Sequence, residues 1–156
     1  MNKEKCKLVE KSTRTQSNSG IWYEMRYGRV TASKSHQAAQ CHTCDGTLVE
    51  EIFGAKLVVE TEAMKRGKLI ENSVKKEVEK QKKIFIQPSR LFLDGTYPFF
   101  GASPDGITDT HVIEIKCPSK KGAFSQYYKN GLIGKKCLAQ IQTQMLLTGK
   151  FFNLNL

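Results

Sequence analysis

Long hydrophobic runs are missing from this chain. None of its apolar stretches approaches the roughly 20 residues of a membrane-spanning helix, and no signal-peptide core follows Met1. We find neither an internal repeat nor a glycine-rich phosphate-binding loop. These absences argue against a helical membrane protein, a repeat array and a P-loop nucleotide hydrolase. They predict an intracellular protein of the nucleus or cytoplasm.

A disulfide framework is also missing, because the five cysteines are odd in number and unevenly spaced. Four potential zinc ligands do cluster, namely His36, Cys41, His42 and Cys44. The pair Cys41 and Cys44 has the spacing of half a zinc site, but a second such pair is absent. We therefore favour a loop with free thiols over zinc, and we place Cys117 on the core side of a strand.

Acidic residues are absent after Glu114. The whole chain has 25 Lys+Arg against 15 Asp+Glu, a formal net charge of +10. The only charged residues that follow Glu114 are lysines: Lys116, Lys120, Lys121, Lys129, Lys135, Lys136 and Lys150. This imbalance favours a polyanionic partner such as DNA, although RNA or an anionic membrane surface would satisfy it too.

The length of 156 residues and the 39% apolar content predict one folded domain. The first twenty residues are mostly polar, so we expect a flexible lead-in over 1–20 and a domain over 21–156.

The apolar pattern predicts a central mixed β-sheet flanked by helices, an α/β fold class. Expected helices cover 22–29, a segment capped by Ser33 through 39, a helix or loop within 50–59, and then 61–81, 123–130 and 135–147. Thr61 is the N-terminal signal of the helix over 61–81. Leu138, Ile141 and Met145 form the apolar stripe of the last helix. Extended segments are expected over 84–87, 91–93, 99–102, 112–116 as the central strand, and 151–156.

Two short runs carry most of the chemical information: GASPDGI over 101–107 and VIEIKCP over 112–118. In a strand, Glu114 and Lys116 share one face, and the turn before it can bring Asp105 alongside. Two carboxylates can hold a hard divalent cation, and a lysine beside them can orient or deprotonate water. The alternative is a solvated carboxylate–lysine pair next to an ordinary Asp-Gly turn.

A third carboxylate, Glu71, falls within the apolar stripe of the expected helix over 61–81. Met64, Gly67, Val74 and Val78 make up that stripe. A charge on a packed helix face needs a partner or a metal ion. The alternative is that Glu71 lies at the stripe's edge and pairs with Lys68 or Lys75.

These segments together resemble the YqaJ-like viral recombinase family, which includes the phage lambda-type exonucleases of the PD-(D/E)xK nuclease superfamily. The resemblance rests on SPDG over 103–106 with EIKCP over 114–118, and on GKLIE over 67–71. It also rests on WYEMR over 22–26 with RVTAS over 29–33, and on QIQTQM over 140–145 with the following Thr148 and Gly149. The four matches occur in the family's order.

The resemblance implies a restriction-endonuclease-like core and a role for each matched residue. Asp105, Glu114, the Ile115 carbonyl and Glu71 would bind the metal. Lys116 would position the attacking water, and Gln140 would support the site from the last helix. The phosphate at a DNA strand end would be bound by Arg26 and Ser33, with Ser103 as a further hydroxyl.

The implied activity is a Mg²⁺-dependent deoxyribonuclease, with Mn²⁺ as an alternative ion, that degrades DNA from its ends in the 5′ to 3′ direction. Double-stranded DNA with a free end is the implied substrate. The implied setting is recombination or replication of viral or mobile DNA, beside a single-strand annealing protein and in a homo-oligomer. Relatives carry further chain after the glutamine-rich helix, so we expect a minimal or C-terminally truncated member. An endonuclease of the same superfamily and a non-catalytic DNA-binding module remain alternatives.

Overall fold

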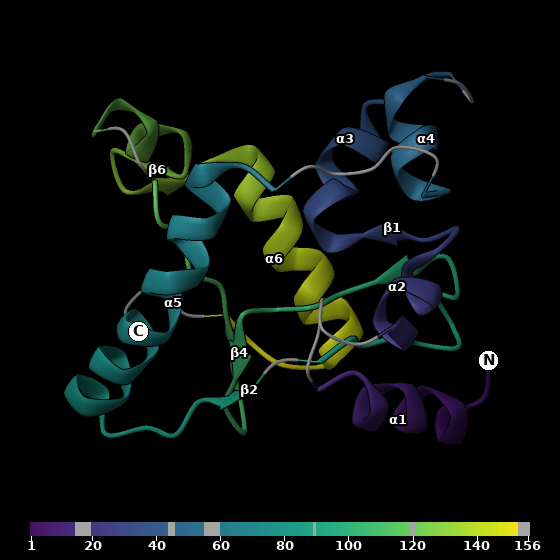
Figure 1. The fold of residues 1–156 in the computed structure, drawn as a ribbon, viewed down its shortest axis with the longest axis horizontal. Helices are drawn as coiled ribbons and strands as arrows, with labels where there is room; N and C mark the ends of the chain where they lie inside the picture. Colours follow the sequence, from purple (N-terminus) through teal and green to yellow (C-terminus); the bar gives the residue numbers. More distant parts are fainter. Residues whose placement is uncertain (15–19, 44–45, 55–59, 89, 119–120, 153–156) are drawn as a thin grey trace.

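The computed structural model describes residues 1–14, 20–43, 46–54, 60–88, 90–118 and 121–152 (Figure 1). Its α-helices are α1 (Lys3–Ser12), α2 (Gly20–Arg26), α3 (Ser35–Ala39), α4 (Thr47–Ile52), α5 (Glu62–Lys82) and α6 (Lys135–Thr148), with 3₁₀ turns η2 (Ala32–Lys34) and η3 (Lys121–Gln126). The strands are β1 (Val30–Thr31), β2 (Gln87–Pro88), β3 (Phe100–Gly101), β4 (Gly106–Ile107), β5 (Val112–Ile113), β6 (Tyr128–Lys129) and β7 (Leu132–Ile133). No helix in these ranges is both long enough and apolar enough to span a bilayer.

The predicted mixture of helices and strands is confirmed, but the described residues do not form one continuous central sheet. Strands β1 and β3 pair in parallel, β2, β4 and β5 form an antiparallel sheet in that order, and β6 and β7 form a separate ribbon. Phe151 extends the antiparallel sheet on the β5 side, where its carbonyl accepts a hydrogen bond from Val112 N.

Strand β5 ends at Ile113, earlier than the predicted strand over 112–116. The reason is local, because the backbone N–H of Ile115 donates to the Asp105 carboxylate and not to a neighbouring strand. A side chain has replaced the next carbonyl of the ladder. The strand has a neighbour on each side, β4 on one and the bridge to Phe151 on the other.

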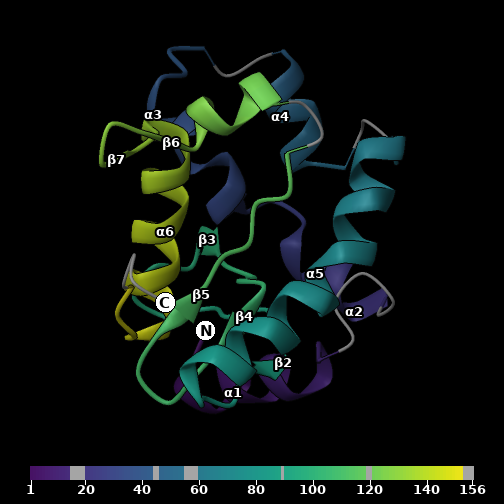
Figure 2. The ribbon, with the colours of Figure 1, turned by 90° about the vertical axis from the view of Figure 1, so that its left-hand side faces the viewer.

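The sheet of β2, β4 and β5 lies between α5 and α6 (Figures 1 and 2). Its α6 side carries the main core cluster, which is made of Ala32, Phe92, Ala102, Ile107, Val112 and Leu147. Helix α6 was predicted correctly, and of its predicted stripe Ile141 is buried and Met145 packs against the core cluster. Leu138 is 39% exposed, whereas the buried positions are Cys137, Ile141, Gln144 and Leu147. A glutamine therefore stands where an apolar residue is expected.

Residues 1–20, expected as a flexible lead-in, include helix α1 in their described part. Helix α1 is capped by the Asn2 side chain, which accepts a hydrogen bond from Lys5 N. Thr13 follows it and is completely buried. Its Oγ1 donates to Val9 O at 2.8 Å and accepts from Leu91 N at 2.9 Å. The polar composition concealed this single anchoring hydroxyl.

Several other local predictions can be checked. Helix α5 begins after Thr61, whose hydroxyl accepts from Met64 N as predicted. Helix α4 begins earlier, at Thr47, and covers only the first residues of the segment expected over 50–59, of which 55–59 lie outside the described residues. Ser33 is inside η2 and does not cap a helix.

The predicted helix over 123–130 is wrong beyond η3. Residues 128–133 form a β-hairpin, because Asn130 (φ 52°) and Gly131 (φ 79°) both adopt the left-handed conformation of a two-residue turn. The expected final strand over 151–156 is confirmed only as a bridge at Phe151, and residues 153–156 lie outside the described part.

We predict that Thr13→Val lowers the free energy of unfolding by about 1–3 kcal/mol, because the buried Leu91 N–H loses its acceptor while the side-chain volume is retained. Denaturant unfolding measures this change. Thr143→Val is the matched control, since that hydroxyl bonds only to a carbonyl of its own helix. Equal stability of the two variants would show that Thr13 does not anchor α1.

Candidate active site

Asp105 is fixed against β5 by two hydrogen bonds. Its backbone N donates to Ile113 O at 3.0 Å, and its Oδ2 accepts from Ile115 N at 2.6 Å. The next residue must be glycine, because a Cβ at Gly106 would lie 2.4 Å from Ile86 Cγ2. The SPDG run thus turns the chain tightly into β4 and presents the aspartate beside the end of β5.

Glu114 is the centre of a hydrogen-bond network. Its side chain is only 4% exposed. Oε1 accepts from Lys116 Nζ at 2.5 Å and from Gln140 Nε2 at 2.6 Å, while Oε2 accepts from Gln144 Nε2 at 2.6 Å. Lys116 Nζ also donates to Gln140 Oε1 at 3.1 Å. Both glutamines come from α6, so this helix holds a nearly buried carboxylate from two sides.

The predicted residues Asp105, Glu114, Lys116 and Gln140 are therefore brought together. Lys116 Nζ contacts the Glu114 carboxylate, the pairing that alternation along a strand predicts, although both residues lie beyond the end of β5. Asp105 is tied to the peptide group between them. The two-residue spacing indicated the first contact, and the glutamine contacts needed the tertiary placement of α6.

The electrostatics reflect two acids close together. Burial, and then the charge of Glu114, raise the pKa of Asp105 to about 7, and the charge of Glu71 acts in the same direction. Burial alone would lower the pKa of Lys116, but Glu114 outweighs it through its charge and its hydrogen bond, and the net pKa is raised. Lys116 is accordingly an ammonium group at neutral pH, which suits donation better than proton abstraction.

Glu71 lies near this group but is paired elsewhere. Its Oε1 accepts from Lys75 Nζ at 2.5 Å, one of the two lysine partners considered above. It nevertheless contributes to the raised pKa of Asp105, which places it within electrostatic range. The expected stripe around it is only partly correct, because Met64 is 43% exposed.

The carboxylates of Asp105, Glu114 and Glu71 are each bonded to a donor of the protein. Across the described ranges, no group of three or more His, Cys, Asp or Glu side chains is arranged to hold a metal ion. Each acid instead meets a protein donor: an ammonium and two amides at Glu114, an ammonium at Glu71, and a peptide N–H at Asp105. For the proposed zinc cluster, Cys41 Sγ lies near Thr43 O, and Cys44 is outside the described residues.

Gln144 is the residue that the sequence analysis missed. It is completely buried, and its Oε1 accepts no hydrogen bond from any described residue. A buried glutamine whose one hydrogen bond among the described residues goes to Glu114 indicates that this carboxylate needs a donor on its Oε2. The available signal was its position one turn after Gln140, on the same face of a helix.

A second group surrounds Trp22, which lies in α2. Its Nε1 donates to Ser103 Oγ at 3.1 Å, and the Arg26 guanidinium lies 3.8 Å from the centroid of its ring. Burial lowers the pKa of Arg26. No carboxylate among the described residues pairs with it. The structure thus brings Arg26 and Ser103 to one indole, while Ser33 is exposed and its hydroxyl meets only that of Thr31.

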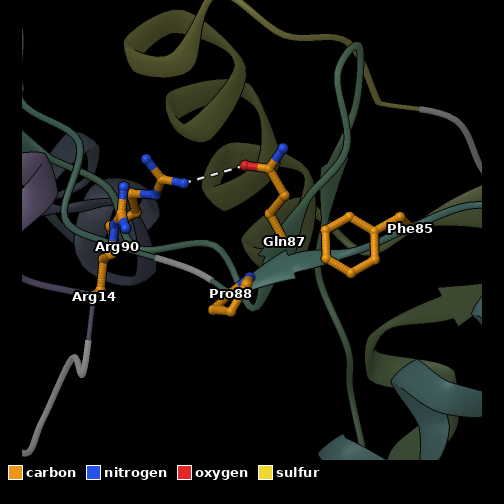
Figure 3. A pocket seen from close by; sticks show the side chains of 5 residues that line it. All are labelled: Arg14, Phe85, Gln87, Pro88 and Arg90. Carbon is orange, nitrogen blue, oxygen red and sulfur yellow. Dashed lines mark hydrogen bonds between the residues drawn. The ribbon is translucent and has the colours of Figure 1, made fainter.

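A surface hollow of about 400 Å³ lies elsewhere, and it holds none of the predicted site residues (Figure 3). Arg14 and Arg90 line one end and Phe85 the other, with Gln87 and Pro88 between them. Arg90 already bonds to Glu10 and Gln87, so its charge is compensated within the protein.

Comparison with solved structures shows a likeness to an exonuclease. The alkaline exonuclease LHK-Exo from Laribacter hongkongensis matches with 29% sequence identity and a TM-score of 0.66, over 83% of this chain and 68% of that one. The structure of LHK-Exo in complex with dAMP matches with 28% identity and a TM-score of 0.70, over 86% and 74% of the two chains. No curated protein matches.

The family comparison covers most of the chain. The model of the YqaJ-like viral recombinase domain matches residues 21–151, a range that includes the network around Glu114 and the group around Trp22. The chain therefore belongs to the YqaJ-like viral recombinase domain family.

Proposed function

We propose that this protein is a metal-dependent exonuclease that hydrolyses DNA from its ends, on a restriction-endonuclease-like core. One observation carries the proposal: Glu114, nearly buried, is held by Lys116, Gln140 and Gln144 next to a second carboxylate on Asp105. Family membership and the likeness to an alkaline exonuclease support it.

The donor set suits a hard divalent cation such as Mg²⁺ or Mn²⁺. Asp105 uses Oδ2 for the Ile115 peptide, and its Oδ1 accepts no hydrogen bond from the described residues. Its raised pKa shows that a neighbouring positive charge would be favourable there. Asp105, Glu114 and the Ile115 carbonyl would hold the ion, and Glu71 would become a further ligand by exchanging its Lys75 partner for the ion. When bound, the ion would neutralise phosphate charge and lower the pKa of water.

Lys116 acts in this proposal as a fixed ammonium. Because Glu114 and Gln140 both accept from its Nζ, the ammonium is oriented before substrate arrives. Its third N–H is available for a water molecule or a phosphate oxygen. It positions the attacking water and stabilises the developing negative charge.

The group around Trp22 would select the strand end. Arg26 is a partly buried cation with an aromatic neighbour and no acidic partner within the described residues. A phosphate would therefore supply the negative charge and the hydrogen-bond acceptors that the guanidinium lacks. Ser103 lies at the same indole and two residues from Asp105, which connects end binding with the proposed site. We infer a preference for 5′-phosphorylated ends and 5′ to 3′ degradation. Recombination or replication of viral or mobile DNA, beside an annealing protein and in a homo-oligomer, is the corresponding setting.

The first test is hydrolysis of linear duplex DNA with Mg²⁺. We expect Asp105→Ala and Lys116→Ala each to lower turnover by at least about 100-fold. Lys76→Ala, an exposed lysine of α5, is the control and retains activity. Wild-type turnover in both variants would reject the site.

The same assay separates the alternatives. A 5′-phosphorylated duplex is degraded faster than its 5′-hydroxyl counterpart, and a covalently closed circle is left intact. Cleavage of the circle would indicate an endonuclease. Metal-dependent binding without any product would indicate a DNA-binding module.

A second prediction concerns the cost of charging Asp105. Its pKa is about 7 in the folded protein and roughly 3.9 in an unfolded chain. The folded state therefore holds the proton more tightly, and the unfolding free energy contributed by this group falls as pH rises from about 4 to 7. Without metal, we expect Asp105→Asn to raise the melting temperature at pH 8 relative to wild type, on the order of 5 °C, and to have no such effect at pH 4.

Thermal unfolding in EDTA and in Mg²⁺ at both pH values measures this difference. Added Mg²⁺ stabilises the wild type at pH 8 and not the variant, because the ion compensates the charge. Asp109→Asn is the control at an exposed aspartate. Parallel pH curves for wild type and Asp105→Asn would contradict the electrostatic account.

The third prediction assigns Gln144 as a positioning residue for Glu114. Gln144→Leu removes the only donor to Glu114 Oε2 among the described residues and fills the site with an apolar group of similar size. We expect kcat to fall roughly tenfold with KM for DNA unchanged, and the acidic limb of the pH profile to move to higher pH.

Gln142→Leu is the matched control, since Gln142 is an exposed glutamine of the same helix. A purely structural glutamine would instead give lower thermal stability with an unchanged pH profile. That result would remove Gln144 from the proposed machinery.

A further inference from the structure

Between the proposed site and α6 the chain forms a small projecting unit, which we call the basic arm and define as residues 121–136. It contains η3, the β6–β7 ribbon and the first residues of α6. The ribbon pairs Tyr128 with Ile133 and Lys129 with Leu132, around the turn at Asn130 and Gly131. It is shaped closely against η3, because a Cβ at Gly134 would lie 2.0 Å from Gln126 O. The arm therefore has defined secondary structure and close internal packing.

Large apolar side chains of the arm face solvent. Phe124 is 57% exposed, Tyr128 39% and Leu132 72%. The rings of Phe124 and Tyr128 lie 6.3 Å apart with an interplanar angle of 66°, so they form one aromatic surface. Exposed aromatic pairs on an ordered element indicate a contact surface.

The charged residues of the arm are all lysines. Lys129, Lys135 and Lys136 are exposed, and within the described ranges none of them pairs with a carboxylate. Lys135 and Lys136 also stand in the first turn of α6, where the helix dipole disfavours positive charge and where no side chain caps the helix. This arrangement is unfavourable for the isolated protein and favourable for an anionic partner.

The arm adjoins the proposed site through α6. Gln140, which bonds both Glu114 and Lys116, follows Lys136 by four residues, an axial rise of about 6 Å. At its other end the arm is separated from Lys116 by only four residues. A partner lying along the arm would therefore continue into the network around Glu114.

We propose that the basic arm binds a single-stranded segment of DNA, with bases stacked on Phe124 and Tyr128 and phosphates on Lys129, Lys135 and Lys136. Stacking on aromatic rings next to lysines recognises single strands without regard to sequence. Lysines and rings on one element match the alternation of phosphate and base along a strand. The proposal rests on the proposed function, since the arm would guide the strand that the site cleaves.

The test is the affinity for a fluorescein-labelled oligothymidylate, measured by anisotropy in EDTA so that no hydrolysis occurs. We expect the double variant Phe124→Ala/Tyr128→Ala to bind roughly tenfold more weakly. The variant Phe124→Tyr/Tyr128→Phe keeps both rings and binds within about twofold of wild type. Phe85→Ala is the control at a ring that is 72% exposed outside the arm.

The contribution of the lysines to binding is tested by measuring DNA affinity at several salt concentrations. Replacing Lys129, Lys135 and Lys136 by glutamine lowers the slope of log affinity against log salt by about 0.7 for each phosphate that a lysine no longer neutralises. Thermal unfolding confirms that each variant is folded, because these side chains are exposed. An unchanged affinity in the ring variant, or an unchanged slope in the lysine variant, overturns the proposal. A ring variant that alters sedimentation but not DNA affinity overturns it in favour of a contact between copies of the chain.

Failure of this proposal is distinguishable from failure of the nuclease assignment. Hydrolysis of bis(4-nitrophenyl) phosphate with Mg²⁺ reports the site without a DNA strand, and we expect the arm variants to retain it. Loss of DNA affinity with that hydrolysis retained supports the arm. If wild-type protein binds the oligonucleotide through the arm but hydrolyses nothing, the arm stands and the nuclease assignment falls.

Discussion

The constraint on which this structure depends is the burial of Glu114 next to Asp105. A carboxylate that is 4% exposed must have its charge and its lone pairs satisfied within the protein. Lys116 supplies charge, and the two glutamines of α6 supply N–H groups to both oxygens. The unusual polarity of the buried face of α6 follows from this requirement, while the neighbouring Asp105 carboxylate ends β5 early.

The negative charge of this acidic pair is only partly compensated within the protein, as the raised pKa of Asp105 shows. Asp105 keeps a pKa of about 7 although it accepts a backbone hydrogen bond, because burial and the charges of Glu114 and Glu71 outweigh that bond. The lysine is meanwhile held in its charged form by the same acid. The protein thus contains a locally unfavourable concentration of negative charge, such as functional sites maintain and structural cores avoid.

Some of this could be predicted from the sequence, for physical reasons. Alternation along a strand placed Glu114 and Lys116 on one side, and the Asp-Gly turn placed Asp105 beside them. Helix α5 was recognisable by its periodicity and by the Thr61 cap. Tertiary contacts decided the rest. The Asp105 carboxylate shortened β5, Thr13 anchored α1, and Glu114 drew Gln144 into the core, while Leu138 remained outside.

The hairpin was missed for a different reason. Its Asn-Gly turn is a short-range signal, but the apolar residues around it also suited a helix, and the pattern alone did not decide between them.

Helix α1 precedes the range matched by the family model, yet Cys6 and Val9 pack against the cluster of Trp22, Leu91 and Leu93. That indole bonds Ser103 and supports the Arg26 guanidinium. Helix α1 therefore covers one side of the group around Trp22. Removing the residues before the matched range would expose one side of the Trp22 ring to solvent. It would also weaken the packing that holds the ring under the Arg26 guanidinium.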